Sequence, residues 1–541
     1  MKVTSYKHKE TKKVEKVYEI WEAMEYFGSY QKIQYLYVCI ATAFVSMYNI
    51  NYIFVAGDIN YRCHVPHCEN TPAQYQVDWW PNSTIDRCSR PIFNSSDTCG
   101  TFKGLVEECN RWVYESNETI IGELDLACQP LKISMIGTIH NVGMLISMVI
   151  SGWVSDRFGR KPALIFFAVA SCVGIVKSFA NSYYMFLVIE CLEAALSGGT
   201  YPAGMVIMIE AGGKKNRVLA GVLFAYAIYV GESTFAIAAM FLPYWKSLIR
   251  LIYTPIILCL SFIYLMSESP RWQFLNGKTE EAIANIERSA KFNKIQINKQ
   301  HAGDIEILKE KLCIREVEDR ESYMKIFTSK EILIRVLVAC VTRFTASFVY
   351  YGMMIHSVWL PGNKYTNFLL STVMSFPGEL ASLYLMNKIG RKLPLIGGFI
   401  VCGTLCLASA FIPKAYTWAV ISLFLLAKMV MSASFTGAVT YAMELFPTNA
   451  RGTLLGVCAF ASRAGGMLAP LTPMLTDIYP PLPYIFFGCT SIMSGLLTTL
   501  TPETKDLPLM DTVEQVEASV QKKKTAAENL EQSRRPSIVP A

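Results

Sequence analysis

The pattern of apolar and polar positions along the chain is dominated by long apolar stretches separated by short polar segments. A stretch of about 18–25 apolar residues can cross the roughly 30 Å hydrocarbon layer of a membrane as an α-helix. The sequence therefore predicts an all-α membrane protein with twelve transmembrane helices. The twelve stretches lie near residues 33–55, 132–154, 162–180, 184–210, 218–241, 247–267, 333–357, 366–386, 394–412, 416–441, 454–476 and 483–500.

Composition and charge agree with this pattern and add an orientation. Of the 541 residues, 52% are apolar and 17% are charged, which is too apolar for a soluble domain of this length. The net charge of +7 arises because Lys and Arg gather in residues 1–32, in alternate turns and in the tail. The positive-inside rule then places both termini in the cytoplasm. Nucleic-acid binding is not supported, because no basic patch with interleaved aromatic residues lies outside the membrane turns.

One polar connection, residues 57–131, has the features of an extracellular loop. It carries three glycosylation sequons, at Asn82, Asn94 and Asn117, and six of the sixteen cysteines. On an oxidising face, six cysteines predict three disulfides, in one of fifteen connectivities that the sequence leaves open. Reduced cysteines on a cytosolic loop or a metal site are the alternatives, the latter disfavoured because only His64 and His67 accompany them. The six are Cys63, Cys68, Cys88, Cys99, Cys109 and Cys128.

Three polar motifs recur at almost one spacing, which indicates an internal duplication. The segment DRFGRK at 156–161 recurs as NKIGRK at 387–392, and glutamates at two further span ends recur at closely similar offsets. The chain is therefore predicted to form two pseudo-symmetric six-helix bundles, the plan of a parallel-repeat secondary transporter. The predicted parts are a cytoplasmic segment (1–32), an N-terminal bundle (33–267), a cytoplasmic helical linker (268–332), a C-terminal bundle (333–500) and a cytoplasmic tail (501–541).

Charged residues beside the short turns are candidates for a gate. The positive-inside rule explains the basic residues, but it does not explain acids at the inner ends of the spans. A carboxylate there can accept hydrogen bonds from a neighbouring helix N-terminus, or from Arg217 and Arg451. Contacts of this kind that form only in one state would bias alternating access, whereas a plain topology anchor is the alternative. The candidate gate residues are Asp156, Arg160, Glu210, Arg217, Glu268, Arg391, Glu444, Arg451 and Glu503.

Ionisable residues within the spans are candidates for an internal site. Each charge at the bilayer centre costs about 2.5–3.5 kcal/mol, so charges that remain there face a watery cavity or a partner. For any one of them, an internal ion pair is an equal alternative. Lys177 lies near a span end and is expected to extend its ammonium to the membrane surface. The internal candidates are Glu190, Glu193, Glu232, Arg343, Glu379, Lys428 and Arg463.

Several motifs resemble those of a known family. GWVSDRFGRK, ESPRW and ELFPTNARG are similar to the signatures of the major facilitator superfamily. Within it, the six-cysteine loop and SRAGGMLAP at 462–470 resemble the organic cation, organic anion and carnitine transporters of solute carrier family 22, over nearly the whole chain. There are two departures: Asn387 stands where an acid is usual, and Glu190 stands where facilitators commonly carry Arg. The resemblance implies the major facilitator fold.

The resemblance also implies a substrate site. It aligns Arg463 with a position that is Asp in cation carriers and Arg in anion and carnitine carriers, and a guanidinium there can clamp a carboxylate. Thr436 stands where cation carriers have an acid, but Glu379 stands where anion carriers have Lys. Matched family positions supply four aromatic rings, and Asn49 is a polar candidate from the first span. The expected substrate-binding residues are Arg463, Glu379, Lys428, Tyr201, Tyr350, Tyr351, Phe435 and Asn49.

Together these features predict a plasma-membrane transporter of small organic ions that works by alternating access. Substrates that carry a carboxylate, either zwitterionic or anionic, are favoured over simple cations. An organic cation transporter is the first alternative, and a non-transporting receptor with a glycosylated outer loop is an alternative of another class. No nucleotide loop, GxSxG or HExxH stands in a suitable setting, so no enzymatic activity, cofactor or metal is expected. The sequence does not determine the oligomeric state.

Overall fold

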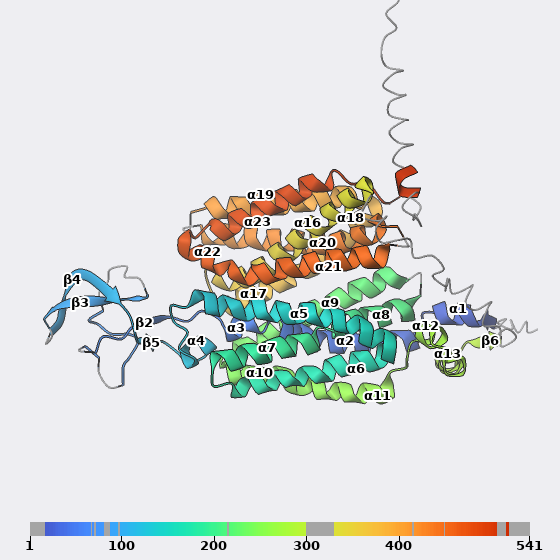
Figure 1. Cartoon of the computed structure of the whole chain (residues 1–541), viewed down its shortest axis with the longest axis horizontal. Helices are drawn as coiled ribbons and strands as arrows, with labels where there is room; N and C mark the ends of the chain where they lie inside the picture. The colour runs from blue at the N-terminus through green and yellow to red at the C-terminus, as the bar shows by residue number, and fades with distance from the viewer. Residues whose placement is uncertain are drawn as a thin grey trace, which may run out of the picture.

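The twelve predicted spans are present as helices in two bundles that lie side by side (Figure 1). The structure is a computed structural model, and it describes residues 17–66, 68–69, 72–80, 87–95, 98–213, 216–298, 329–413, 416–447, 450–505 and 515–518. Ten helical segments are long and apolar enough to cross a membrane. The fourth span is divided into α7 and α8 at Gly198 and Gly199, and the twelfth is the shorter helix α23. The observed bounds differ from the predicted ones by a few residues.

The first bundle, which we call the N-half, comprises residues 29–265. Its elements are α2 (Ser29–Ile50), α3 (Tyr52–Val55), α5 (Pro130–Phe158), α6 (Arg160–Ala170), η1 (Ser171–Phe179), α7 (Tyr183–Ser197), α8 (Thr200–Gly212), α9 (Arg217–Phe241), α10 (Trp245–Tyr253), η3 (Thr254–Ser261) and α11 (Phe262–Leu265).

The second bundle, the C-half, comprises residues 330–498. Its elements are α16 (Lys330–His356), η4 (Ser357–Trp359), α17 (Lys364–Val373), α18 (Ser375–Lys388), α19 (Lys392–Phe411), α20 (Thr417–Leu445), α21 (Arg451–Leu468), η5 (Ala469–Leu471), α22 (Pro473–Ile478) and α23 (Leu482–Thr498).

Large apolar side chains cover the outside of both bundles. Tyr264 is 88% exposed, Trp418 82% and Val149 73%, and many other large apolar residues around them are similarly exposed. Apolar surface of this extent marks an interaction with a partner or a membrane. Since it lies on helices long enough to cross a bilayer, hydrocarbon is its natural environment.

A small disulfide-bonded domain stands at one end of the bundles, which we call the loop end (Figure 1). It forms two antiparallel strand pairs, in which Tyr61 faces Tyr114 and Ser89 faces Glu108. The backbone N–H of Trp245 donates to Glu118 O at 2.9 Å and holds the domain against the N-half. The elements are β2 (Tyr61–Cys63), β3 (Ser89–Ser95), β4 (Thr98–Glu108), β5 (Trp112–Tyr114) and α4 (Ile120–Glu123).

The connection between the halves begins at the opposite end, the linker end. Helix α13 packs its apolar face on α1 and α12, with Ile20, Ala23, Phe274 and Ile286 in a small separate core. This agrees with the amphipathic helix that the sequence predicts in the linker, of which residues 299–328 lie outside the described residues. The elements are β1 (Val17–Glu19), α1 (Ile20–Glu25), α12 (Pro270–Leu275), α13 (Thr279–Asn293) and β6 (Gln296–Asn298), which pairs in parallel with β1.

The two halves are joined at the loop end and in the middle of the bundles. At the loop end, Phe54 stacks on Tyr365 with ring centroids 5.2 Å apart, and Thr138 Oγ1 donates to Met467 O at 3.0 Å. In the middle, Tyr229 of α9 contacts α18 and α20. Among the described residues we find the hydrogen bonds and ring contacts between the halves in these two regions, so the molecule is closed at the loop end.

Candidate functional site

The repeated motif of the two halves builds the same structure twice at the linker end. Gly159 and Gly390 each adopt a positive φ, 111° and 129°, in the turn before α6 and before α19. A side chain at either glycine would collide with a carboxylate, that of Glu268 or that of Glu503. The absence of a Cβ therefore allows each glutamate to approach the first turn of a helix, where unpaired backbone N–H groups and the helix dipole favour an anion.

The hydrogen bonds of the two glutamates are equivalent. Glu268 Oε1 accepts from the backbone N–H of Arg160 at 3.0 Å, and Glu503 Oε1 accepts from that of Arg391 at 2.9 Å. The next backbone N–H, of a lysine in both halves, donates to the same carboxylate. These contacts lie within each half, so the glutamates connect the third span to the sixth and the ninth to the twelfth.

The arginines of the motif bind the second pair of acids. Arg160 Nε lies 3.6 Å from Glu210 Oε1, and Arg391 Nε lies 3.0 Å from Glu444 Oε2. The sequence suggested Arg451 as the partner of Glu444, but its guanidinium donates to Phe446 O at 3.2 Å instead. Arg217 begins α9, and its side chain lies outside the described part of the chain.

Asp156 differs from the other candidate gate residues. Its carboxylate is 75% exposed and pairs at 2.5 Å with Arg160 of the same hairpin. Exposed pairs of this kind contribute little to stability. In this state, which is closed at the loop end, the contacts of the described gate residues lie within their own halves.

We predict that the two equivalent glutamates respond differently to substitution. Burial raises the pKa of Glu268. Burial also acts upward on Glu503, but four backbone N–H groups outweigh it and lower the pKa of that carboxyl. A lowered pKa stabilises the fold above the ordinary value of 4.5, and this stabilisation is lost as the pH falls through the folded pKa. Glu503→Gln should therefore cost about 1 kcal/mol near neutral pH, and Glu268→Gln should cost less.

Thermal unfolding of purified protein in detergent, followed against pH, would check this prediction. The difference between wild type and Glu503→Gln should shrink in acid, because the wild-type carboxylate is then protonated too. Equal losses for both variants near neutral pH would contradict the prediction.

A second group of polar and aromatic side chains converges where the halves meet in mid-bundle, and we call it the central cluster. Lys428 is fully buried and lies over the Tyr350 ring, 3.2 Å from its centroid. The Tyr350 ring is 5.2 Å from that of Phe435, over which Arg343 lies at 5.6 Å. The cluster consists of Tyr201, Glu232, Arg343, Tyr350, Tyr351, Glu379, Lys428, Phe435 and Arg463.

The two carboxylates of the central cluster differ in their hydrogen-bond partners. Glu379 accepts from Thr436 Oγ1 at 2.7 Å and from Tyr229 OH at 3.4 Å, so the halves share this carboxylate. Glu232 is buried, and its Oε2 has no hydrogen-bond partner among the described residues. Buried polar atoms without a partner are uncommon and mark sites where a ligand or water binds.

Two other side chains of the central cluster also carry a buried polar atom without a partner among the described residues. Arg343 Nη1 and Tyr201 OH are buried without a partner in the described part of the chain. Arg463 lies within electrostatic range of Tyr201 and Arg343, and the described residues give its guanidinium no hydrogen bond or ion pair. Three cationic and two acidic side chains thus belong to one region; Lys428 donates to Tyr350 O at 3.1 Å, whereas the described residues give Arg463 no hydrogen bond.

A buried ionic network occupies the interior of the N-half. Lys177 Nζ lies 2.9 Å from Glu190 Oε2 and 3.4 Å from Glu193 Oε2. His140 Nδ1 lies 2.8 Å from Glu190 Oε1, and its Nε2 lies 3.1 Å from Asn49 Oδ1. The side chains of all four ionisable residues have no exposed surface. We call Lys177, Glu190, Glu193 and His140 the N-half network.

Two expectations are corrected by this network. Lys177 does not extend to the membrane surface; its ammonium is held inside by two carboxylates and by Tyr253 OH at 2.8 Å. Asn49, expected with the substrate residues, contacts His140 instead. His140 could not be identified from the sequence, since a single histidine in a span has no periodicity that marks it.

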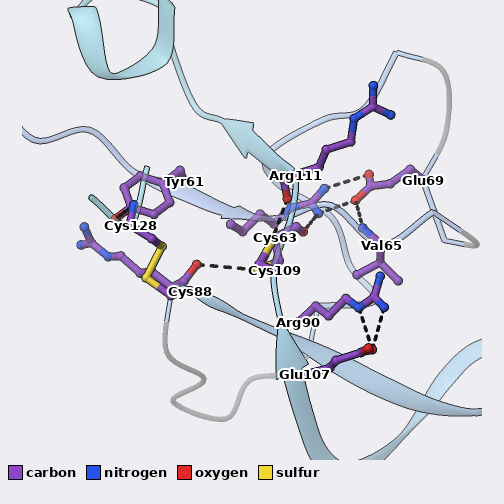
Figure 2. Close-up of a disulfide and its surroundings, with 12 residues drawn as sticks. Tyr61, Cys63, Val65, Glu69, Cys88, Arg90, Glu107, Cys109, Arg111 and Cys128 are labelled. Atoms are coloured by element: carbon purple, nitrogen blue, oxygen red, sulfur yellow. Dashed lines mark hydrogen bonds and ion pairs between the residues drawn. A yellow bond between two sulfur atoms is a disulfide. The ribbon is translucent and has the colours of Figure 1, made fainter. Parts of the chain in front are cut away.

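The loop domain contains three disulfides, which join Cys63 to Cys109, Cys68 to Cys99 and Cys88 to Cys128. Figure 2 shows the first and third of these beside Tyr61, with Glu69 ion-paired nearby. The partner of Glu69 is Arg62, which is buried and also donates to backbone carbonyl groups. Asn117 is exposed, as a glycosylation site requires; Asn82 and the side chain of Asn94 lie outside the described residues.

Comparison with known proteins identifies the class of transporter. The family model described as "Sugar (and other) transporter" matches residues 36–515. The organic cation transporter protein of Drosophila melanogaster is 28% identical, over 90% of this chain and 92% of its own length. Solute carrier family 22 member 2 of Homo sapiens is also 28% identical, over 85% of this chain and 83% of its own.

Solved structures confirm the fold. The xylose transporter of E. coli, in a partially occluded inward-open conformation, superimposes with a TM-score of 0.60 over 89% of this chain and the whole of the other, at 15% identity. These relatives are transporters rather than enzymes. The chain is therefore a multi-pass membrane transporter with the major facilitator fold, and it belongs to the sugar (and other) transporter family, in which its curated relatives are organic cation transporters and other members of solute carrier family 22.

Proposed function

We propose that the protein moves small organic ions that carry a carboxylate across the plasma membrane, by alternating access of the central cluster. The observation that carries the proposal is that the described residues give the guanidinium of Arg463 no hydrogen bond or ion pair, and that Arg343 Nη1 of the same central cluster is buried without a partner among them. Arginine presents a planar fork of donors that matches a carboxylate. A substrate carboxylate in this place would satisfy donors that the described protein groups leave unsatisfied.

Charge in the central cluster favours the same class. Arg343, Lys428 and Arg463 outnumber Glu232 and Glu379, and Glu379 already accepts two hydrogen bonds. A bound carboxylate would balance the positive excess. The aromatic rings of Tyr350, Tyr351 and Phe435 can contact an ammonium group of the same molecule, so a zwitterion such as carnitine or an amino-acid derivative suits both parts.

The second candidate is an organic cation transporter, which the names of the curated relatives favour. A simple cation would use Glu232, whose Oε2 is unpartnered, and the aromatic rings. In both cases the loop domain would lie outside the cell, with the linker and both termini in the cytoplasm, as the lysine and arginine distribution predicts.

Uptake of a matched pair of compounds would distinguish the candidates. L-carnitine and its methyl ester share the quaternary ammonium, but only the first carries a carboxylate. Proteoliposomes should accumulate carnitine about tenfold faster than the ester, the factor that one lost charge-assisted hydrogen bond produces. Faster uptake of the ester and of tetraethylammonium would support the cation transporter, and binding without accumulation would identify a receptor.

A further inference from the structure

The N-half network has an unbalanced charge that its protein neighbours do not correct. With both carboxylates ionised, Lys177 supplies one positive charge against two negative ones. A neutral His140 would leave the network with a net negative charge in a place without solvent contact. Uncompensated buried charge is strongly unfavourable, so one additional proton would make the network neutral.

The geometry of His140 provides a place for that proton. Its Nδ1 faces a Glu190 carboxylate oxygen and its Nε2 faces the side-chain oxygen of Asn49. Both ring nitrogens donate in the imidazolium form, whereas neutral imidazole has only one donor. Glu193 adds a second, independent feature: its Oε1 is buried and has no hydrogen-bond partner among the described residues. The network therefore has room for a proton on the ring, between Glu190, which Nδ1 contacts at 2.8 Å, and Glu193, whose Oε2 lies 4.0 Å from the same nitrogen.

The titratable groups that the surrounding elements bring to the network are mainly tyrosines and cysteines; besides those named below, Tyr201 of α8 lies within electrostatic range of Glu193. Tyrosines come from α2, α3 and α10, and cysteines come from η1, α7 and η3. Tyr253 bonds Lys177, and Asn51 bonds Tyr253. The guanidinium of Arg250, on α10, is directed to Ser178. The tyrosines and cysteines are Tyr48, Tyr52, Tyr253, Cys172, Cys191 and Cys259.

Helix α5 connects this network to the interface between the halves. His140 points into the N-half, whereas Gly137, Thr138 and Asn141 of the same helix contact the C-half, at Pro470, Met467 and Gly466. The ring of Tyr52 lies 5.7 Å from that of His140 and, like Pro470 of the C-half, lies next to Gly137 of α5. A change of charge at His140 therefore acts on the helix that closes the loop end.

We propose that the N-half network binds one exchangeable proton and that occupancy of this site is coupled to the closing of the loop end by α5. The proton comes from water, binds to a ring nitrogen of His140 and returns to water when it dissociates. No other bond is made or broken. Proton binding itself is independent of the proposed function, whereas its coupling to substrate movement depends on it.

Proton binding can be tested on purified protein without a substrate, by thermal unfolding between about pH 5 and pH 8, where histidine titrates. The informative variant is Glu193→Gln, which keeps the side-chain shape and leaves a network that is neutral without a proton. The unfolding temperature of wild type should fall as the pH rises and the proton dissociates. The difference between the unfolding temperatures of Glu193→Gln and wild type should therefore shift by about 5 °C in favour of the variant across the interval. A difference between the two that does not change with pH would overturn the proposal.

A matched control uses His356, another buried histidine, whose Nε2 bonds the Thr472 hydroxyl at 3.0 Å. In a His356→Gln background, the same substitution of Glu193 should produce the same pH-dependent gain. If removing His356 abolishes the gain, the titrating group is not His140 and the proposal is wrong.

Coupling is tested in proteoliposomes at a clamped membrane potential with labelled L-carnitine and tetraethylammonium, whose charges are constant in this pH interval. An imposed pH gradient should change net wild-type uptake several-fold, while Glu193→Gln should keep exchange but lose the response. If the net uptake rate of wild type does not change with the pH gradient, the proposed coupling is wrong. If wild type exchanges neither probe, the proposed function fails, and the unfolding experiment still decides whether the proton site exists.

Discussion

Replacing Lys177 with methionine is expected to destabilise the protein by about 3–5 kcal/mol, the usual effect of removing one partner of a buried ion pair. The ammonium lies between Glu190 and Glu193 with no solvent contact, and methionine has a similar length but no charge. The loss is a large part of the 5–15 kcal/mol that stabilises a typical domain. We expect little monodisperse protein by size-exclusion chromatography and a strongly lowered unfolding temperature.

Two variants make this prediction specific. The triple substitution Lys177→Met, Glu190→Gln and Glu193→Gln removes all three charges and should recover much of the lost stability. Lys388→Met is the matched control, because Lys388 is exposed, and its ammonium donates to the Tyr384 hydroxyl at 2.9 Å rather than to a carboxylate. A Lys177→Met protein that unfolds at the wild-type temperature would show that the network is not needed for stability.

Arg463→Ala is expected to reduce transport of carboxylate-bearing compounds by 10- to 100-fold, and to leave tetraethylammonium transport nearly unchanged. One charge-assisted hydrogen bond from the guanidinium to a substrate carboxylate accounts for about 1.5–3 kcal/mol, which corresponds to this range of affinity. Arg463→Lys keeps the charge and loses the planar fork, so it should recover only part of the activity. Initial rates over a range of substrate concentrations would measure both effects.

The outcome that contradicts this prediction is an equal loss for carnitine, its methyl ester and tetraethylammonium. Such a result would indicate that Arg463 supports the structure of α21 rather than binding a carboxylate. An Arg463→Ala protein with normal carnitine uptake would reject the carboxylate clamp altogether.

The spans and their duplication could be predicted from the sequence because both depend on local pattern. Apolar length identifies a membrane helix without knowledge of its neighbours, and the repeated Gly-Arg-Lys turn occurs where a positive φ and a nearby glutamate require glycine. The three disulfides were also expected from cysteine number and context. Their connectivity was not, because pairing depends on how β2 to β5 fold in space.

The ionic partners could not be predicted for the same reason. Arg451 is seven residues from Glu444 in sequence, but the side chain that reaches this acid comes from Arg391, near the start of the ninth span. Lys177 looked like a surface residue because it is close to the end of its span, whereas its side chain is fully buried and its ammonium contacts side chains of α7 and α10. Contacts between helices that are far apart in sequence decide both cases.

The disulfide domain is joined to the membrane part through α3 and α5, and its α4 region is tied to Trp245 at the start of α10. These attachments all belong to the first six spans, so we expect the domain to move together with that half. The distance between a fluorophore placed on Asn117 and another at the loop end of the opposite half would thus report the movement of the halves from outside the transport path. Such a pair would record each opening and closing in single molecules while the substrate route stays unlabelled.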